Sequence, residues 1–327
     1  MISVIIPNYN DAETLPLCLE AVLSSECSNF EVIVVDDKST DNSVEIINKY
    51  NVRLLMHNEN QGQAAARNTG AKQAKGEILL FTDGDVCLKK NTLENVADIF
   101  SRKKEIAAIV GMPDKECVYQ NLSSIHFNRR IHFNYLKLPD YINVLYGTIS
   151  AVKKEAFCKI GGFTEGMTGV EDNEIGFRLV DSGYKIHHSK DIHVIHHKKI
   201  YFLQLLKNDF KRTVDRMKLL LGRKQLKSVV SEKRFITSPM YQLLSPFLSF
   251  FFFLFASLGF LYCQIFLLSS FALLMFVVLN MGYLSFNSKE EGALLSIKLF
   301  NLLLIDMFIV FTALVWGGLL FLKGEKY

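Results

Sequence analysis

The first two thirds of the chain alternate short apolar runs with segments whose apolar residues recur at helical spacing. Apolar runs at 2–6, 30–35, 52–56, 77–81 and 106–110 have the length of buried strands. Helical spacing over 14–24, cap residues at 39–41 and an Ala-rich stretch at 61–74 predict helices between these runs. Strands that alternate with helices predict an α/β fold with a doubly wound, mainly parallel sheet.

The alternation weakens after the fifth apolar run and then resumes. Residues 120–138 are rich in aromatic side chains and His, and we expect them to form an excursion over the functional site. Residues 146–152 predict another strand. Two short strands, at 185–187 and 192–195, are expected to close this part of the fold.

The last third of the chain is dominated by Phe, Leu, Ile and Val. Since about 20 apolar residues cross a bilayer, we expect about three spans, near 243–262, 265–286 and 302–322. Residues 201–221, which precede them, combine an apolar stripe with many Lys and Arg residues, a pattern that predicts a helix lying on an anionic membrane surface. A helix packed on a soluble domain would show the same stripe, so that alternative stays open.

These patterns predict an α/β domain at 1–199, an interfacial helix and linker at 200–235, and a transmembrane region at 236–327. The Lys and Arg residues before the first span predict a multi-pass protein of the cell membrane with its α/β domain in the cytoplasm. An odd number of spans would put Tyr327 outside. The chain enters a strand at once, so we expect no signal peptide.

Composition excludes several other classes of protein. The net charge is +4 over 327 residues, and no basic stripe interleaved with aromatic residues appears in the first part, so we expect no nucleic-acid partner. The six cysteines are scattered without a Cys-x-x-Cys pair. This spacing favours reduced thiols over a disulfide framework or a zinc site.

The strongest candidate for chemistry is the end of the apolar run at 77–81, which continues into Thr82-Asp83-Gly84-Asp85. In open α/β sheets, ligands bind outside the carboxyl ends of the strands. Asp83 and Asp85 can converge there on a divalent cation that a diphosphate also binds, and oxygen ligands suit Mg²⁺ and Mn²⁺. An isolated Asp-x-Asp is also typical of a solvated turn, so the surrounding motifs decide between the two.

Six segments of the chain occur in a characteristic order. They are Val4-Ile5-Ile6-Pro7-Asn8-Tyr9-Asn10, Val34-Val35-Asp36-Asp37-Lys38-Ser39, Ala66-Arg67-Asn68-Thr69-Gly70, Thr82-Asp83-Gly84-Asp85, Gly161-Gly162-Phe163 and Glu171-Asp172. In this order the chain resembles family 2 glycosyltransferases of the GT-A fold, over roughly residues 1–200. The resemblance implies inverting transfer of a sugar from a nucleotide-diphosphate donor, with Mg²⁺ or Mn²⁺ as cofactor.

The resemblance also implies roles for residues that bind the donor and the metal. Pro7 and Tyr9 would line the base pocket, and Asp37 would accept a hydrogen bond from a uracil-like base. Asp83 would approach the ribose and the metal, and Asp85 would be the main metal ligand.

Two basic residues extend this set. Arg67 would contact the nucleotide or its phosphates, although a solvated helix arginine is the alternative reading. His196 is the best match to a late histidine that completes the metal site, ahead of His193 and His197. A surface histidine is the alternative here, because imidazole is an unusual partner for Mg²⁺.

Asp172 would be the catalytic base, with Glu171 beside it. Inversion needs a carboxylate on the face opposite the departing diphosphate, where it takes the proton of the acceptor hydroxyl. The metal at Asp85 would neutralise the charge of the leaving group. Acids in a first helical turn are also favoured by the helix dipole alone, which is the competing explanation.

Two departures from the family narrow the expected activity. Polymer-forming members carry Gln-x-x-Arg-Trp, whereas Gln204 is followed by Leu205-Leu206-Lys207 and the only Trp is Trp316. The run after Asp85 lacks the Gln and Pro of polyprenyl-phosphate sugar synthases.

We therefore expect a non-processive, hexosyltransferase-like enzyme that uses a UDP-sugar and a lipid-linked acceptor in cell-surface glycan or glycolipid synthesis. A catalytically inactive nucleotide-sugar-binding membrane scaffold is the main alternative, and a nucleotidyltransferase, whose Gly-rich N-terminal loop is missing, is a weaker one.

Overall fold

The computed structural model describes residues 1–222, 234–235, 238–239 and 244–325. Contacts divide the chain into two units, the first made of residues 1–118 and 138–198 and the second of residues 119–137 and 199–327. Most of the predicted linker (223–233), the residue that opens the first predicted span (243) and Tyr327 lie outside the described residues.

The first unit is built on a mixed, mainly parallel sheet. Its nine strands in the described part of the chain are β1 (Ile2–Asn8), β2 (Phe30–Asp36), β3 (Arg53–Met56), β4 (Ile78–Thr82), β5 (Val86–Leu88), β6 (Ile106–Pro113), β7 (Tyr141–Ile142), β8 (Ile149–Lys153) and β9 (Lys185–His196). They follow the order β3-β2-β1-β4-β8-β6-β9-β5, with β7 paired to β9. The pairs β1–β2, β2–β3, β1–β4 and β6–β9 are parallel, whereas β8, β5 and β7 pair antiparallel. The predicted α/β class is confirmed.

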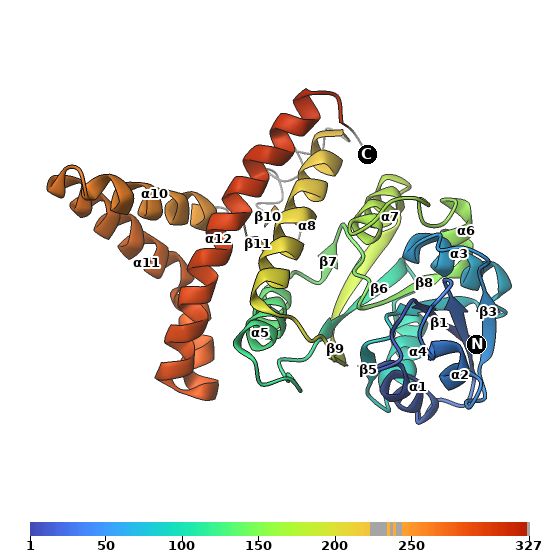
Figure 1. The fold of residues 1–327 in the computed structure, drawn as a ribbon. Helices are drawn as coiled ribbons and strands as arrows, with labels where there is room; N and C mark the ends of the chain where they lie inside the picture. The colour runs from blue at the N-terminus through green and yellow to red at the C-terminus, as the bar shows by residue number, and fades with distance from the viewer. Residues whose placement is uncertain (223–233, 236–237, 240–243, 326–327) are drawn as a thin grey trace. The chain divides into compact units, whose positions relative to one another are not determined.

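Helices cover both faces of this sheet (Figure 1). They are α1 (Leu15–Leu23), α2 (Ser43–Ile47), α3 (Gln63–Gln73), α4 (Thr92–Arg102), α6 (Lys154–Lys159) and α7 (Glu171–Asp181). Val4 and Ile6 of β1 belong to one core cluster with Leu15 of α1. Ile5, between them, points to the other face, where a Cβ added to Gly70 of α3 would lie 2.5 Å from its Cγ2. Burial on both faces explains why the strands read as continuous apolar runs.

The last segment of this unit forms one long strand, β9 (Lys185–His196), rather than the two short strands predicted at 185–187 and 192–195. β9 pairs with β6 through irregularities, so that Val110 lies opposite His188 while Met112 lies opposite His193. Extra residues of this kind keep a strand in the ladder while bending it. The carboxyl end of β9 pairs with β5 in the antiparallel direction.

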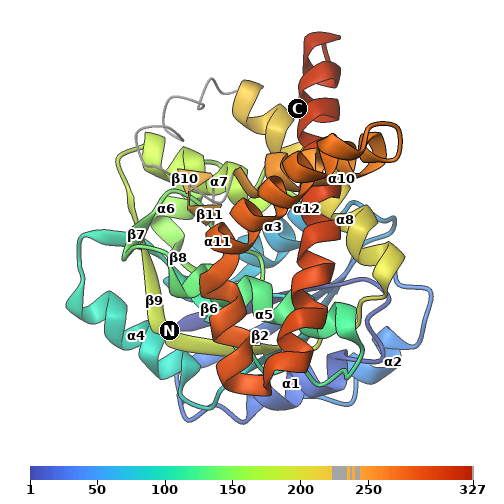
Figure 2. The same ribbon diagram turned by 90° about the vertical axis from the view of Figure 1, so that its left-hand side faces the viewer.

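The second unit consists mainly of helices. They are α5 (Leu122–Leu136), α8 (Phe202–Gly222), α10 (Leu244–Gly259), the 3₁₀ turn η2 (Cys263–Ile265), α11 (Phe266–Glu291) and α12 (Ala293–Leu322), with a short antiparallel pair, β10 (Arg234–Phe235) and β11 (Ser238–Pro239). α10 packs on α11, and α12 packs on α8 (Figure 2). The aromatic-rich segment at 120–138 thus forms a helix that belongs by its contacts to this unit.

Among the residues that the structure describes, two helices are long and apolar enough, by length and composition, to cross a membrane. They are the 29-residue helix Cys263–Glu291 and the 30-residue helix Ala293–Leu322. The apolar helix α10 has 16 residues, a length of about 24 Å against a bilayer core of roughly 30 Å. The presence and number of spans stay predictions.

A buried ion cluster holds α5 among the other helices of the second unit. Arg130 of α5 donates hydrogen bonds to Asp306 of α12 and to Asp209 of α8. The Asp306 side chain is fully buried, and His126 Nε2 lies 3.7 Å from its Oδ2. Because a buried charge is tolerated only when it is paired, the carboxylates on α8 and α12 require the arginine of α5. This requirement explains why a segment inserted between β6 and β7 folds with the C-terminal helices.

Gly176 allows α7 to lie directly against the segment that precedes β8. A Cβ at this position would lie 2.4 Å from Val144 Cα and 2.5 Å from Leu145 N, both backbone atoms. We expect Gly176→Ala to lower the free energy of unfolding by about 1–3 kcal/mol, as overpacking does elsewhere. Thermal unfolding of the purified protein measures the change. Gly318→Ala, in α12, is the control because its added methyl group meets nothing within 4 Å; equal melting temperatures for the two variants would contradict this close packing.

Candidate active site

Acidic and amide side chains gather at the carboxyl ends of the parallel strands. β1, β2 and β4 are parallel neighbours and end at Asn8, Asp36 and Thr82. Asn8 Nδ2 donates a hydrogen bond of 2.7 Å to Asp36 Oδ1. Asp37 follows β2 directly and Asp83 follows β4, so the topology brings both predicted site residues to the same edge of the sheet.

Asp37 holds the loop that leads into α3. Its carboxylate accepts hydrogen bonds from Gln61 N at 2.9 Å, from Gly62 N at 2.7 Å and from His57 Nδ1 at 2.7 Å. Gly62 has a φ of +88°, a conformation that glycine adopts without strain. The buried Asp37 therefore fixes the backbone at this edge.

The end of β1 presents an aromatic ring to solvent. Pro7 is buried within the strand, whereas Tyr9, two residues later, is 46% exposed. An exposed ring on rigid backbone offers a surface on which a planar ligand can stack. The next residue, Asn10, has a φ of +57°, and its Oδ1 accepts a hydrogen bond of 2.7 Å from Thr40 N. This bond ties the end of β1 to the loop after β2.

Arg67 of α3 is buried between acids from two other elements. Its side chain is 1% exposed, which excludes the alternative of a solvated helix arginine. Nη2 donates a hydrogen bond of 2.8 Å to Asp83 Oδ1, and Nη1 donates one of 3.0 Å to Glu171 Oε1. The guanidinium carbon also lies 5.5 Å from the centre of the Phe163 ring. The planar fork of arginine suits this double contact better than lysine would.

The charges around Arg67 reinforce one another. Burial alone would lower the pKa of Arg67, but Asp83, Glu171 and Asp172 together raise it above its ordinary value. A Cβ on Gly147 would lie 3.0 Å from Arg67 Nη2, so a larger residue there would crowd the arginine. The arginine thus stays charged and joins the acid that follows β4 to the acids that begin α7.

Glu171 and Asp172 are neighbours in sequence but differ in environment. Glu171 is buried and bonded to Arg67. Asp172 is half-buried; its Oδ2 accepts a hydrogen bond of 3.0 Å from Gly147 N, and its Oδ1 accepts one of 2.8 Å from Asn173 N. Leu145 N also donates to the main-chain oxygen of Asp172 at 3.2 Å. These bonds fix the start of α7 against residues 145–147.

The pairing of β5 with β9 brings Asp85 and His196 together. Val86 lies opposite His196, and His197 N donates a hydrogen bond of 2.7 Å to the main-chain oxygen of Asp85. His196 Nε2 lies 3.3 Å from Asp85 Oδ1. His193 sits three residues earlier on β9, opposite Met112 of β6. Of the three histidines considered from the sequence, the structure therefore sets His196 beside the Asp85 carboxylate.

Two charged residues near Asp85, Lys198 and Asp11, do not belong to the site predicted from the sequence. Lys198 Nζ donates a hydrogen bond of 2.7 Å to Asp85 Oδ2. Asp11 lies against the turn between Asp83 and Asp85, since a Cβ on Gly84 would be 3.1 Å from its Oδ2. The available signals were weak: Asp11 directly follows the first motif, and Lys198 lies in a short basic run after His196.

These charges shift one another's pKa values. Burial alone would raise the pKa of Asp85, but His196 and Lys198 hold it well below its usual range. Burial raises the pKa of Asp11 to about 6, and the nearby Asp85 carboxylate adds to this rise. Burial would lower the pKa of Lys198, whereas Asp85, Asp83 and Asp11 raise it. The Lys198 ammonium thus compensates part of the negative charge of Asp85, Asp83 and Asp11.

The donor atoms near Asp85 fit a metal ion only in part. Carboxylate oxygen and imidazole nitrogen are both ligands of Mn²⁺ and related ions. Asp83, the third predicted ligand, bonds to Arg67, and the described residues include no group of three or more His, Cys, Asp or Glu side chains arranged to hold a metal. Magnesium-type sites often use one or two carboxylates together with substrate phosphates. Asp85 and His196 therefore fit an ion that a phosphate ligand completes.

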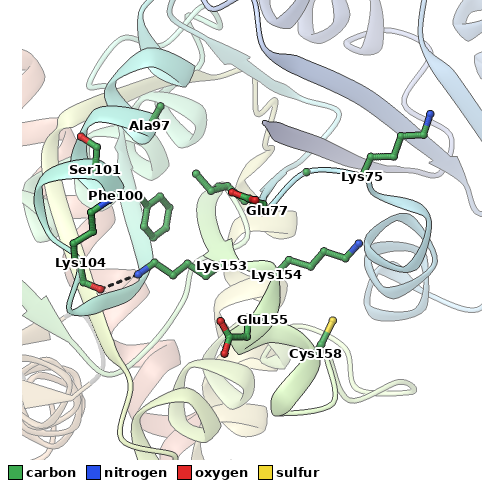
Figure 3. A pocket seen from close by; sticks show the side chains of 12 residues that line it. Lys75, Glu77, Ala97, Phe100, Ser101, Lys104, Lys153, Lys154, Glu155 and Cys158 are labelled. Atoms are coloured by element: carbon green, nitrogen blue, oxygen red, sulfur yellow. Dashed lines mark hydrogen bonds between the residues drawn. The ribbon is translucent and has the colours of Figure 1, made fainter.

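A hollow of about 740 Å³ lies at the amino end of β4, opposite the end that leads into Asp83 (Figure 3). It is lined by Glu77 and Ile78 at the amino end of that strand and by Lys153 and Lys154 at the end of β8. Asp83 follows the carboxyl end of β4. The hollow therefore does not belong to the candidate active site.

A mixed sheet with this strand order and an Asp-Gly-Asp turn after a central parallel strand is a GT-A-like fold. Residues 3–161 match the model of glycosyl transferase family 2, and residues 128–200 match that of the N-terminal domain of galactosyltransferase. Glycosyltransferase AglE of Haloferax volcanii is 32% identical over 220 residues, which are 64% of this chain and 71% of that protein. The chain belongs to glycosyltransferase family 2.

Two further matches cover different lengths of the chain. An uncharacterized glycosyltransferase of Haemophilus influenzae is 32% identical over 184 residues, 55% of this chain but only 62% of that protein, less than two thirds of its length. The mannosyltransferase PcManGT of Pyrobaculum calidifontis, solved in complex with GDP-Man and Mn²⁺, has a TM-score of 0.58 at 17% identity. That comparison covers 99% of this chain and 88% of the mannosyltransferase. It shows the shared fold.

The Arg67 bridge makes a prediction about stability. Arg67→Met leaves Asp83 and Glu171 without their cation, and we expect a loss of about 3–5 kcal/mol of unfolding free energy, as when one partner of a buried ion pair is removed. Denaturant unfolding measures it. Adding Glu171→Gln to Arg67→Met should restore part of the loss, because one uncompensated charge disappears.

Arg53→Met is the matched control for this variant. Arg53 also donates two hydrogen bonds, to the main-chain and side-chain oxygens of Gln73, but it is exposed. Substitutions at exposed positions usually change stability by no more than about 0.5 kcal/mol. If Arg67→Met and Arg53→Met lowered the free energy of unfolding equally, the buried Arg67 bridge would not stabilise the site more than an exposed arginine does.

Proposed function

We propose that the protein is a membrane-anchored, metal-dependent, inverting glycosyltransferase that moves a sugar from a nucleotide-diphosphate donor to an acceptor hydroxyl. One observation carries the proposal: Arg67 joins Asp83, the first residue of the Asp-Gly-Asp turn, to Glu171, which directly precedes Asp172. Inverting transfer needs one acid site for the donor's diphosphate and another for the acceptor's proton. The bridge holds two such sites in a single framework.

The edge of the sheet near β1 and β2 would bind the nucleotide. The exposed ring of Tyr9, beside Pro7, would stack on the base. The Asp37 carboxylate would accept a hydrogen bond from the N–H of a uracil-like base, which favours a UDP-sugar as donor. Asp83 would approach the ribose, with Arg67 orienting its carboxylate.

Asp85 and His196 would hold Mg²⁺ or Mn²⁺, with Asp83 at the edge of the site. When bound, the ion supplies positive charge that stabilises the leaving diphosphate. The pairing of β5 with β9 supports this assignment, because it sets the two side chains 3.3 Å apart.

Asp172 would act as the general base. Its half-exposed carboxylate, oriented by the main-chain N–H groups of Gly147 and Asn173, would accept the proton of the acceptor hydroxyl. Glu171 is buried on Arg67, so its contribution would be to position the start of α7 rather than to accept the proton. The two acids of this motif would then have different tasks.

The long apolar helices α11 and α12 support a membrane anchor. The Lys and Arg residues before the first predicted span favour a catalytic domain on the cytoplasmic side. Such an anchor favours an acceptor that is itself held in the membrane, namely a lipid-linked hydroxyl or oligosaccharide of cell-surface glycan or glycolipid synthesis. The chain lacks Gln-x-x-Arg-Trp after Asp172, which favours a single transfer over polymer synthesis.

Substitution of the two acid sites should separate donor binding from turnover. We expect Asp85→Ala to abolish metal-dependent binding of the donor. Asp172→Asn should leave donor binding nearly unchanged and lower turnover by about 10²–10⁴-fold, the usual contribution of a general base. Release of nucleotide diphosphate from a panel of nucleotide sugars, with Mn²⁺ and membrane lipids present, gives turnover, and calorimetry gives binding.

Asp181→Asn, at the exposed end of α7, is the control for Asp172→Asn. Full turnover by Asp172→Asn would assign the base to another residue. If the wild-type protein releases no nucleotide diphosphate from any donor, the inactive nucleotide-sugar-binding scaffold becomes the better explanation.

The acceptor can be identified in cells. We expect cells that carry Asp172→Asn to accumulate one unextended lipid intermediate, because the block falls directly after that lipid is made. Mass spectrometry of lipid extracts from wild-type and variant cells detects it and shows the mass of the missing sugar. An unchanged lipid profile together with altered protein-linked or soluble glycans would exclude a lipid acceptor.

A further inference from the structure

Lys198 neutralises the Asp85 carboxylate, the group that a metal ion would need. Its Nζ lies 2.7 Å from Asp85 Oδ2, while His196 Nε2 lies 3.3 Å from Oδ1 of the same carboxylate. Both oxygens of the expected main metal ligand therefore already face nitrogen atoms. The Asp85 side chain is 10% exposed, so water does little to weaken this ion pair.

The ammonium and a divalent cation exclude each other at this position. They compete for the charge of the same carboxylate, and their like charges repel at such a distance. Asp11 and Asp83 add negative charge around Lys198, which makes the position attractive to whichever cation fills it. In the free protein the chain's own cation fills it.

The Lys198 side chain is able to turn away from Asp85. Lys198 is the last residue of the first unit, two positions after β9 ends, and its side chain is 38% exposed. Lysine carries its charge on a flexible four-carbon stem, so the ammonium can turn to another anion without movement of the backbone. The buried Arg67, 1% exposed, has no such freedom.

We propose that Lys198 is a built-in counter-ion of Asp85 that yields this carboxylate to the metal when the donor arrives and then binds the donor's diphosphate. The inference rests on the proposed function, since it names the ligand that Lys198 exchanges for Asp85. Metal and donor then enter together: the metal replaces the ammonium on Asp85, and the diphosphate replaces Asp85 as the partner of the ammonium. Such mutual replacement makes the binding of metal and donor cooperative.

The test compares the wild-type protein with Lys198→Met, which keeps the stem and removes the charge. Mn²⁺ alone, titrated without nucleotide and followed by electron paramagnetic resonance, should bind Lys198→Met about fivefold more tightly, the factor that corresponds to the loss of one partly exposed ion pair. UDP and GDP, titrated without metal, should bind Lys198→Met more weakly than the wild type by a similar factor. Lys198→Arg, which retains the charge, should behave as the wild type in both titrations.

Lys89→Met is the matched control. Lys89 Nζ also lies 2.7 Å from an aspartate oxygen, Oδ2 of Asp114, but outside the site, and its loss should change neither titration. Unchanged Mn²⁺ affinity in Lys198→Met, or unchanged metal-free affinity for both nucleotides, overturns the proposal. The Mn²⁺ titration needs no turnover, so a wild-type protein that transfers no sugar would refute the proposed function while leaving the outcome for Lys198 readable by itself.

Discussion

The candidate site depends on one guanidinium that is almost fully removed from water. Arg67 lies 16 residues from Asp83 and 104 residues from Glu171 along the chain, yet it donates a hydrogen bond to each. Charges buried in this way are stable only together, so α3, the turn after β4 and the start of α7 must assemble as one structure. The half-exposed Asp172 acquires its orientation from this assembly, because it follows Glu171 directly.

The same rule of compensation operates at two other places, with different consequences. Arg130 pairs with Asp306 and Asp209 inside the helical unit and ties α5 to α8 and α12. Lys198 pairs with Asp85, but its side chain is 38% exposed. A buried arginine with a planar fork makes a permanent bridge, whereas a partly exposed lysine can exchange its partner. The degree of burial therefore separates the structural ion pairs from the one that a ligand can open.

Local patterns predicted most of the first unit. Strands buried on both faces appear as apolar runs, so β1, β2, β4 and β6 were readable, as was the mainly parallel sheet. β5 and β7 have three and two residues and are too short to show a period. The continuity of β9 was missed because a bulge interrupts its regular alternation. Helix α5 was not predicted from the sequence, because a buried arginine, rather than an apolar stripe alone, holds it in place.

The α/β class, the apolar character of the last third of the chain and the acids that follow β2 and β4 could all be predicted from the sequence, because each of these features depends on neighbouring residues alone. The three predicted spans correspond to the 16-residue helix α10 and the longer helices α11 and α12. The pairing of charges from distant segments became visible only in the folded protein. Lys198 and Asp85 are 113 residues apart, and Arg67 and Glu171 are 104 apart. An ion pair between distant segments leaves no periodic trace in either one, because it forms only where the sheet and its helices bring the two segments together.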